Sequence, residues 1–175
     1  MIEIIKDILP NDINRQIILY LLNSDRWRIA KDVDNDFRLL KNLLDSPGGD
    51  FGNSLQTFDE FDKKFIDTPL NIYAEIIYSI VKQRTKYNFN RAKRFYWNYY
   101  NNAAAPEIHK DREEDNYVSF VYNLNTNDGG TEIENKLYPS ISGEAIIFKS
   151  NLPHRGTAPK SVKARFNLNC IVELS

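Results

Sequence analysis

The sequence predicts an α+β domain that is mainly β, in which N-terminal helices support an antiparallel jelly roll or barrel. Residues 1–90 contain two amphipathic helical patterns, whereas residues 91–175 contain short aromatic and β-branched runs separated by turn formers. Since no helical pattern separates these runs, their strands should pair antiparallel. A chain of 175 residues can bury one sizeable core, so a single domain over 1–175 is expected.

Two helices are expected in residues 1–90. The first should begin after Pro10, where Asn11 and Asp12 can cap free amide groups. The second should follow Thr68, a capping side chain, and Pro69, which has no amide hydrogen. Their apolar residues recur at helical spacing: Ile13, Ile17, Ile18, Leu21 and Leu22, and then Leu70, Tyr73, Ile76, Ile77, Ile80 and Val81. The first helix has one apolar face, and the stripe of the second should dock on a sheet.

Four strands are expected in residues 91–175. They are "RFYWNYY" (94–100), "NYVSFVYNL" (116–124), "GEAIIFKS" (143–150) and "KARFNLNCIVEL" (163–174). The segments "NTNDGG" and "PSISG" have the composition of turns between them. Gly129 and Gly130 are assigned to a tight turn on this basis.

The composition disfavours several classes of function and several locations in the cell. The 23 Lys and Arg residues are balanced by 24 Asp and Glu residues, so the broad positive field that favours nucleic-acid binding is absent. No run is long enough to span a bilayer, and the charged start "MIEIIKDILPND" does not resemble a signal peptide. With a single cysteine, no internal disulfide requires an oxidising compartment. A cytoplasmic protein is the expectation.

The two histidines of the chain carry the strongest functional signal. In "HKD", His109 and Asp111 project to one side only if the backbone is extended. An imidazole and a carboxylate are half of a divalent metal site, and His154 is the only other histidine that can complete it. The alternative is a surface histidine in an acidic loop.

The last predicted strand has one polar face. Arg165, Asn167 and Asn169 alternate with Phe166, Leu168 and Cys170. If the apolar face packs on the core, the polar face lines a wet cavity or binds an anion. The alternative is an ordinary half-exposed strand. Cys170 shares the apolar phase, which favours packing over a nucleophilic role.

Taken in order, "HKD", "DGGTEI" (128–133), "GEAIIF" (143–148), "PH" (153–154) and Arg165 resemble the iron(II) and 2-oxoglutarate dependent dioxygenases, in particular the prolyl 4-hydroxylase-like branch. The family fold is a double-stranded β-helix, a cupin-like jelly roll with helices buttressing one sheet. The resemblance implies that His109, Asp111 and His154 bind Fe(II). It implies further that Arg165 binds the far carboxylate of 2-oxoglutarate, with Tyr100 hydrogen bonded to the co-substrate and Asn167 assisting Arg165. The alternative for Tyr100 is a packing residue, because "RFYWNYY" is aromatic on both faces.

The resemblance also implies the reaction. An enzyme of this family uses O2 and 2-oxoglutarate to hydroxylate an unactivated C–H bond and releases succinate and CO2. A prolyl residue in a peptide or protein is one candidate substrate, and a free amino acid or small metabolite is another. Prolyl 4-hydroxylases usually place lysine where Arg165 stands. Nucleic-acid demethylases often carry a second arginine six residues after the first, and Ile171 occupies that position.

Two other functions are compatible with the same residues. Two histidines and a carboxylate also suit zinc, which would make a hydrolase in which Arg165 has no evident role. The chain could also be a non-catalytic cupin-like binding module. In any of these cases, residues 46–54 and 113–115 are candidate lids over the site.

Overall fold

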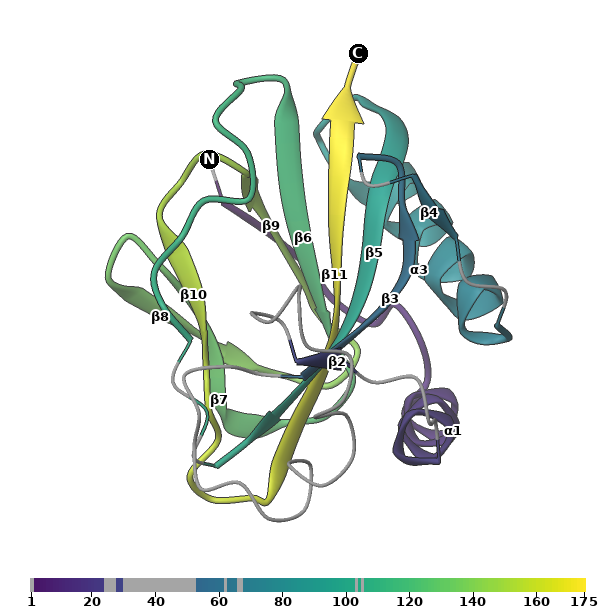
Figure 1. Cartoon of the computed structure of the whole chain (residues 1–175), viewed down its shortest axis with the longest axis vertical. Coiled ribbons are helices and arrows are strands. Elements are labelled where there is room, and N and C mark those ends of the chain that lie inside the picture. The colour runs from purple at the N-terminus through teal and green to yellow at the C-terminus, as the bar shows by residue number, and fades with distance from the viewer. Residues whose placement is uncertain are drawn as a thin grey trace.

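The computed structural model describes residues 2–23, 28–29, 53–61, 63–65, 68–102, 104 and 106–175. Its strands form two antiparallel sheets that face one another, as Figure 1 shows. The predicted jelly roll with N-terminal supporting helices is confirmed. No helix in these residues is long and apolar enough to cross a membrane.

The larger sheet has one face covered by helices, and its other face forms one side of the candidate site, called the floor. Its strands run in the order β1 (Glu3–Ile5), β9 (Ala145–Lys149), β6 (Tyr117–Asn123), β11 (Ala164–Leu174), β5 (Phe89–Asn101), β3 (Asn53–Asp59) and β2 (Arg28–Ile29), and β4 (Lys64–Phe65) pairs with β3. The smaller sheet has the order β10 (His154–Thr157), β7 (Asn127–Ile133) and β8 (Lys136–Ser140). Strands β5 and β11 pair over almost their full length, which fixes the register of the floor.

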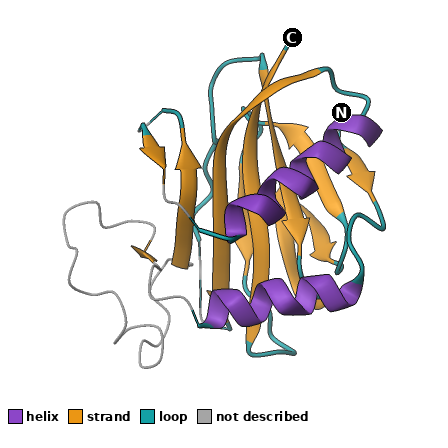
Figure 2. Ribbon diagram, turned by 90° about the vertical axis from the view of Figure 1, so that its right-hand side faces the viewer, coloured by secondary structure: helices purple, strands orange, loops and turns teal. Residues whose placement is uncertain are grey.

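Two helices, α1 (Asn11–Leu22) and α3 (Leu70–Arg84), cover one face of the larger sheet (Figure 2). The main core lies between this face and the helices, and its fully buried side chains include Ile17, Leu21, Ile77, Val81, Trp97, Phe120, Leu168 and Cys170. Burial also raises the pKa of the Cys170 thiol well above its usual value. Cys170 therefore packs in the core, as its strand phase predicts.

The helical stripes are rotated slightly from the predicted ones. Leu22 is 58% exposed and Ile76 is 42% exposed, so their assignment to the packed stripes is wrong. On α3 the buried positions include Ala74 and Tyr78, which follow the same 3.6-residue period from Leu70. The 3.6-residue period predicted the helix correctly. It did not predict which of the neighbouring apolar residues face the core.

A polar contact also anchors α1. Asn14 is buried, accepts a hydrogen bond of 2.6 Å from the Tyr122 hydroxyl and donates one of 3.1 Å to Ser142. The helix is thereby tied to β6 and to the turn that precedes β9.

The glycines of "DGGTEI" do not form the predicted turn. Gly129 and Gly130 lie inside β7, and neither has a positive φ. A Cβ on Gly130 would overlap the Tyr138 carbonyl, and one on Gly129 would lie 2.7 Å from the Thr157 carbonyl oxygen. They are required because β8 and β10 approach closely. Gly143, with φ of 84°, does serve the turn predicted from "PSISG".

Candidate metal centre and anion site

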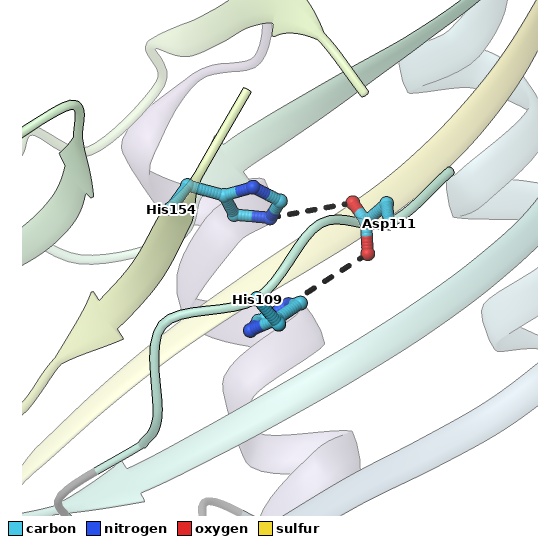
Figure 3. Close-up of side chains that lie close together, drawn as sticks. All are labelled: His109, Asp111 and His154. Atoms are coloured by element: carbon cyan, nitrogen blue, oxygen red, sulfur yellow. Dashed lines mark ion pairs between the residues drawn. The ribbon is translucent and has the colours of Figure 1, made fainter. Parts of the chain in front are cut away.

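One β-bridge brings the two histidines together. The His109 amide donates to the His154 carbonyl oxygen and the His154 amide to the His109 carbonyl oxygen, each over 2.9 Å. The imidazole centroids lie 4.5 Å apart, and Asp111 projects to the same side (Figure 3). One potential ligand atom from each of the three residues lies within 4.8 Å of the others.

The backbone fixes the same tautomer for both imidazoles. Nδ1 of His109 lies 3.1 Å from the Glu107 carbonyl oxygen, and Nδ1 of His154 lies 2.9 Å from that of Leu152. Because a carbonyl oxygen only accepts, each Nδ1 carries the hydrogen and each neutral ring keeps its lone pair on Nε2.

The Nε2 acceptor of His154 faces the cluster. This Nε2 atom is buried without a hydrogen-bond partner, and Asp111 Oδ2 lies 3.5 Å away. An orphaned buried lone pair is costly unless a cation or a donor meets it. The three residues therefore fit a divalent metal bound on one face, with histidines oriented by their outer nitrogen atoms.

Asp111 is held from the floor of the site. Arg94 donates to Oδ1 over 2.8 Å, and Ser119 donates to Oδ2 over 2.6 Å. Ser119 also contacts Ser150 at 2.8 Å, and the Asp111 amide donates to the Ser150 carbonyl oxygen. Burial alone would raise the pKa of Asp111, but the Arg94 guanidinium and the hydrogen bond from Ser119 outweigh it and hold that pKa well below its usual range.

Arg165 is a buried cation with unused donors. Its side chain is 1% exposed, and Nη2 donates to Thr131 over 3.1 Å and to Asn123 over 3.4 Å. Nε and Nη1 are buried without partners, and no carboxylate in the described residues pairs with it. Burial lowers its pKa to about 10, so the group is still charged near neutrality.

Tyr100 lies beside Arg165. It is paired in register with Arg165, whose guanidinium carbon is 5.2 Å from the Tyr100 ring centroid. Burial raises the pKa of the hydroxyl, which stays protonated and able to donate. Gly156 leaves room for the ring, since a Cβ there would lie 2.7 Å from the Tyr100 hydroxyl oxygen.

The two asparagines of β11 face the same side as Arg165. Asn167 accepts a hydrogen bond of 3.0 Å from Asn98, and no hydrogen bond between Asn167 and Arg165 is formed. Asn169 has a buried Oδ1 without a partner. The polar face of β11 therefore lines the space between the sheets, in keeping with the wet-cavity interpretation.

A hollow of about 250 Å³ lies beside His154. It is lined by Ile108, Glu132, Glu134, Asn135, Pro153 and His154. Side chains alternate between the two faces of a strand, so Ile108, Pro153, Glu132 and Glu134 have the opposite phase to the two histidines and Ile133. The hollow therefore lies on the outer side of the smaller sheet.

The structure describes one of the two candidate lids and only the end of the other. Residues 46–52 lie outside the described residues, and Asn53 and Ser54 belong to β3. In the acidic segment, Glu113 pairs with Lys110 at 2.8 Å and Glu114 pairs with Arg112. Asp115 accepts from Asn151 over 2.7 Å. The acidic segment is thus tied to its surroundings by several side chains.

Arg94, Ser119, Thr131 and Asn123 are absent from the set predicted from sequence. One signal was available, because alternation along "RFYWNYY" puts Arg94 on the same strand face as Tyr100. The pairing of that face with Asp111 depends on contacts between distant segments, which periodicity does not show.

Comparison with solved structures identifies the fold. A prolyl-4-hydroxylase from Pseudomonas putida aligns with a TM-score of 0.62 and 15% identity, over 99% of this chain and 92% of that one. A Trichoplax adhaerens prolyl hydroxylase in complex with a hypoxia inducible factor peptide fragment gives 0.61 and 16%, over 98% and 83%. HygX from Streptomyces hygroscopicus, with nickel and 2-oxoglutarate bound, gives 0.58 and 12%, over 99% and 83%.

No protein-family model and no curated protein sequence matches the chain. The likeness is therefore one of structure: the chain has the fold of the 2-oxoglutarate dependent oxygenases, with a His-Asp-His cluster in it. The resemblance stated from sequence is confirmed at this level.

Proposed function

We propose that the protein is an Fe(II) and 2-oxoglutarate dependent oxygenase that hydroxylates an unactivated C–H bond of its substrate. The observation that carries the proposal is Arg165, a buried guanidinium with two unpartnered nitrogen atoms and no carboxylate partner among the described residues. A buried cation is stable only with a counter-charge, and a carboxylate matches the guanidinium fork. An anionic co-substrate supplies the carboxylate partner that Arg165 does not have among the described residues.

The spacing of Arg165 from the histidines suits a dicarboxylate. Along β7, Ile133 is paired with His154, while Thr131, which binds Arg165, is paired with Gly156. Two residues of strand correspond to roughly 7 Å. A molecule with one end on the metal and the other on Arg165 would lie along this stretch, beside the hydroxyl of Tyr100.

The protein residues have separate tasks in this reaction. His109, Asp111 and His154 would hold iron from one face, leaving the opposite positions open. The bound iron, with 2-oxoglutarate and O2, supplies the oxidising power for attack on the C–H bond. Phe148, with its ring centroid 4.7 Å from that of His154, keeps water from one side of the site. No side-chain base is required, and the described site offers no third histidine.

The two alternative functions do not account for all the features of the candidate site. A zinc hydrolase would employ the His-Asp-His cluster, but the unpaired charge of Arg165 would have no purpose. A non-catalytic module would need neither the open face of the cluster nor the orphaned Nε2 of His154.

For the substrate, we propose a peptide or small molecule, with a prolyl residue as one candidate. The Trichoplax neighbour was solved in complex with a peptide fragment, which supports a peptide as one class of substrate. Arg165 in place of the usual lysine argues against a strict prolyl 4-hydroxylase, and the balanced charge disfavours nucleic acid.

Anaerobic absorption spectroscopy tests the proposal. Fe(II) and 2-oxoglutarate added together should give a metal-to-ligand charge-transfer band that Fe(II) alone does not give, and admission of O2 should yield succinate. Zn(II) in place of Fe(II) is the control and should give neither. No band and no succinate with iron would overturn the proposal. A screen of peptides, amino acids and nucleotides for stimulated succinate release would then define the substrate.

A further inference from the structure

Arg94 on β5 is an additional charged group in contact with the candidate metal cluster. Its Nη2 donates to Asp111 Oδ1 over 2.8 Å, and its side chain is only 18% exposed. The register pairs Arg94 with Ile171 of β11, so the arginine rises from the floor of the site. A buried arginine rarely approaches a carboxylate by chance, because both groups must be desolvated.

Arg94 is itself fixed by a chain of contacts. Its guanidinium carbon lies 4.2 Å from the centroid of the Tyr96 ring. The Tyr96 hydroxyl donates over 2.9 Å to Asp59 Oδ2, and Asp59 is 2% exposed. Asp59 Oδ1 in turn accepts from the Phe61 amide over 2.9 Å. Tyr96 and Asp59 therefore help to fix the arginine, and its position is set by β5 and the end of β3.

Arg94 could affect a bound metal in two opposite ways. As a cation near the cluster it would repel a divalent ion and weaken binding. As a fixed donor it would hold the carboxylate where it can share an ion with both histidines, and strengthen binding. Asp59 carries a compensating negative charge behind the arginine, which reduces the repulsion. The fixed geometry therefore favours the second effect.

We propose that Arg94 is a positioning residue for the metal centre, which holds the Asp111 carboxylate in the orientation needed to share one divalent ion with His109 and His154. This inference rests on the proposed function. In it, Tyr96 and Asp59 position the arginine, and Ser119 holds the second carboxylate oxygen.

The test is the affinity of the protein for Mn²⁺ alone, measured by isothermal titration calorimetry without co-substrate. Arg94→Gln should raise the dissociation constant about 10- to 100-fold, the usual effect of removing a group that orients a ligand. Arg94→Lys keeps the charge but loses the planar fork, and should recover only part of the affinity. Visible absorption of the Co²⁺ form should change in Arg94→Gln, because it reports the geometry of the ligands.

Arg91→Gln is the matched control. Arg91 lies on the same strand and is 58% exposed at its side chain, and it pairs with Glu60 and Glu173 rather than with the cluster. This variant removes the same charge from β5 and should bind Mn²⁺ like the original protein. Unchanged or tighter Mn²⁺ binding by Arg94→Gln would overturn the positioning role. Tighter binding is the result expected if Arg94 acts only as a cation that repels the metal.

Tyr96→Phe covers the case in which Arg94→Gln does not fold. It removes only the hydroxyl that reaches Asp59, and should weaken Mn²⁺ binding several-fold while Arg94 is still present. Affinity equal to that of the unaltered protein would overturn the proposed chain of contacts. If the unaltered protein bound neither Mn²⁺ nor Fe²⁺, the proposed function itself would fail, which is a different result from equal binding by all variants.

Discussion

His109 and His154 exchange two backbone hydrogen bonds, each of 2.9 Å, so that a single β-bridge sets both imidazoles side by side. The bridge uses only main-chain atoms. The arrangement of the two ring-bearing residues is therefore a property of the fold, and the side chains can be changed without removing the bridge.

Replacing His109 by alanine should abolish metal binding and 2-oxoglutarate turnover but leave the fold intact. The His109 side chain is 52% exposed, so its loss should change the free energy of unfolding by only about 0.5 kcal/mol. Urea denaturation and Mn²⁺ titration check the two halves of this prediction. Lys110→Ala, on the opposite side of the segment, is the control and should retain turnover. Succinate production by His109→Ala would remove this residue from the cluster.

His154→Ala should abolish turnover in the same way. Here the ring is buried against Phe148, so a moderate loss of stability is expected as well. Circular dichroism should show an unchanged strand content, and coupled turnover assays should show none above the background. Turnover near that of the unaltered protein would contradict the assignment of His154.

Asp111→Ala should destabilise the metal-free protein far more than His109→Ala does. The substitution leaves Arg94 buried without its carboxylate, and breaking such a pair costs about 3–5 kcal/mol. Chemical denaturation in the presence of a chelator measures the difference. The double variant Asp111→Ala with Arg94→Met removes the stranded charge and should regain part of the loss. Equal stability of Asp111→Ala and His109→Ala would show that the pair contributes little.

Arg165→Ala should weaken 2-oxoglutarate binding much more than metal binding. Loss of a buried charge-assisted contact costs about 2–5 kcal/mol, which raises the apparent KM for 2-oxoglutarate about 30-fold or more. The affinity for Mn²⁺ alone should be unchanged. Arg155→Ala is a suitable control, because this arginine is 41% exposed and pairs with Glu132. An unchanged KM in Arg165→Ala would remove Arg165 from the co-substrate site.

Gly156→Ala should disturb the same site through Tyr100. The added Cβ would lie 2.7 Å from the Tyr100 hydroxyl oxygen, so the ring must move from its place beside Arg165. Overpacking of this kind costs about 1–3 kcal/mol of stability. The KM for 2-oxoglutarate should rise with Mn²⁺ affinity retained. A KM in Gly156→Ala equal to that of the unaltered protein would exclude Tyr100 from the site.

The sequence predicted the long, strongly patterned elements. Both helices and the strands around Trp97, Phe120, Ile147 and Leu168 were found from periodicity, because each has an apolar face on the main core. Strands β1 to β4 in residues 1–90 and strands β7, β8 and β10 were missed. Strands β7 and β8 contain Gly129, Gly130 and Pro139, residues that signal turns locally, and the two glycines here allow close packing of neighbouring strands.

Some residues of the candidate site could likewise be predicted from sequence, and others could not. His109, Asp111 and His154 could be suggested from sequence because metal-binding chemistry restricts residue types, and Arg165 because its strand alternates. Strand alternation puts Arg94 on the same face as Tyr100, but its contact with Asp111 could not be predicted, because it depends on the register between β5 and β11 and on the loop that carries Asp111. That information is nonlocal and appears only in the folded chain.

The most direct measurement is an anaerobic crystal structure of the protein with Mn²⁺ and 2-oxoglutarate. We expect one anomalous peak bonded to Nε2 of His109, Nε2 of His154 and the Asp111 carboxylate, with the far carboxylate of 2-oxoglutarate on the free donors of Arg165. A metal bound elsewhere, or a 2-oxoglutarate molecule that does not reach Arg165, would contradict the assignment of this cavity as an oxygenase active site.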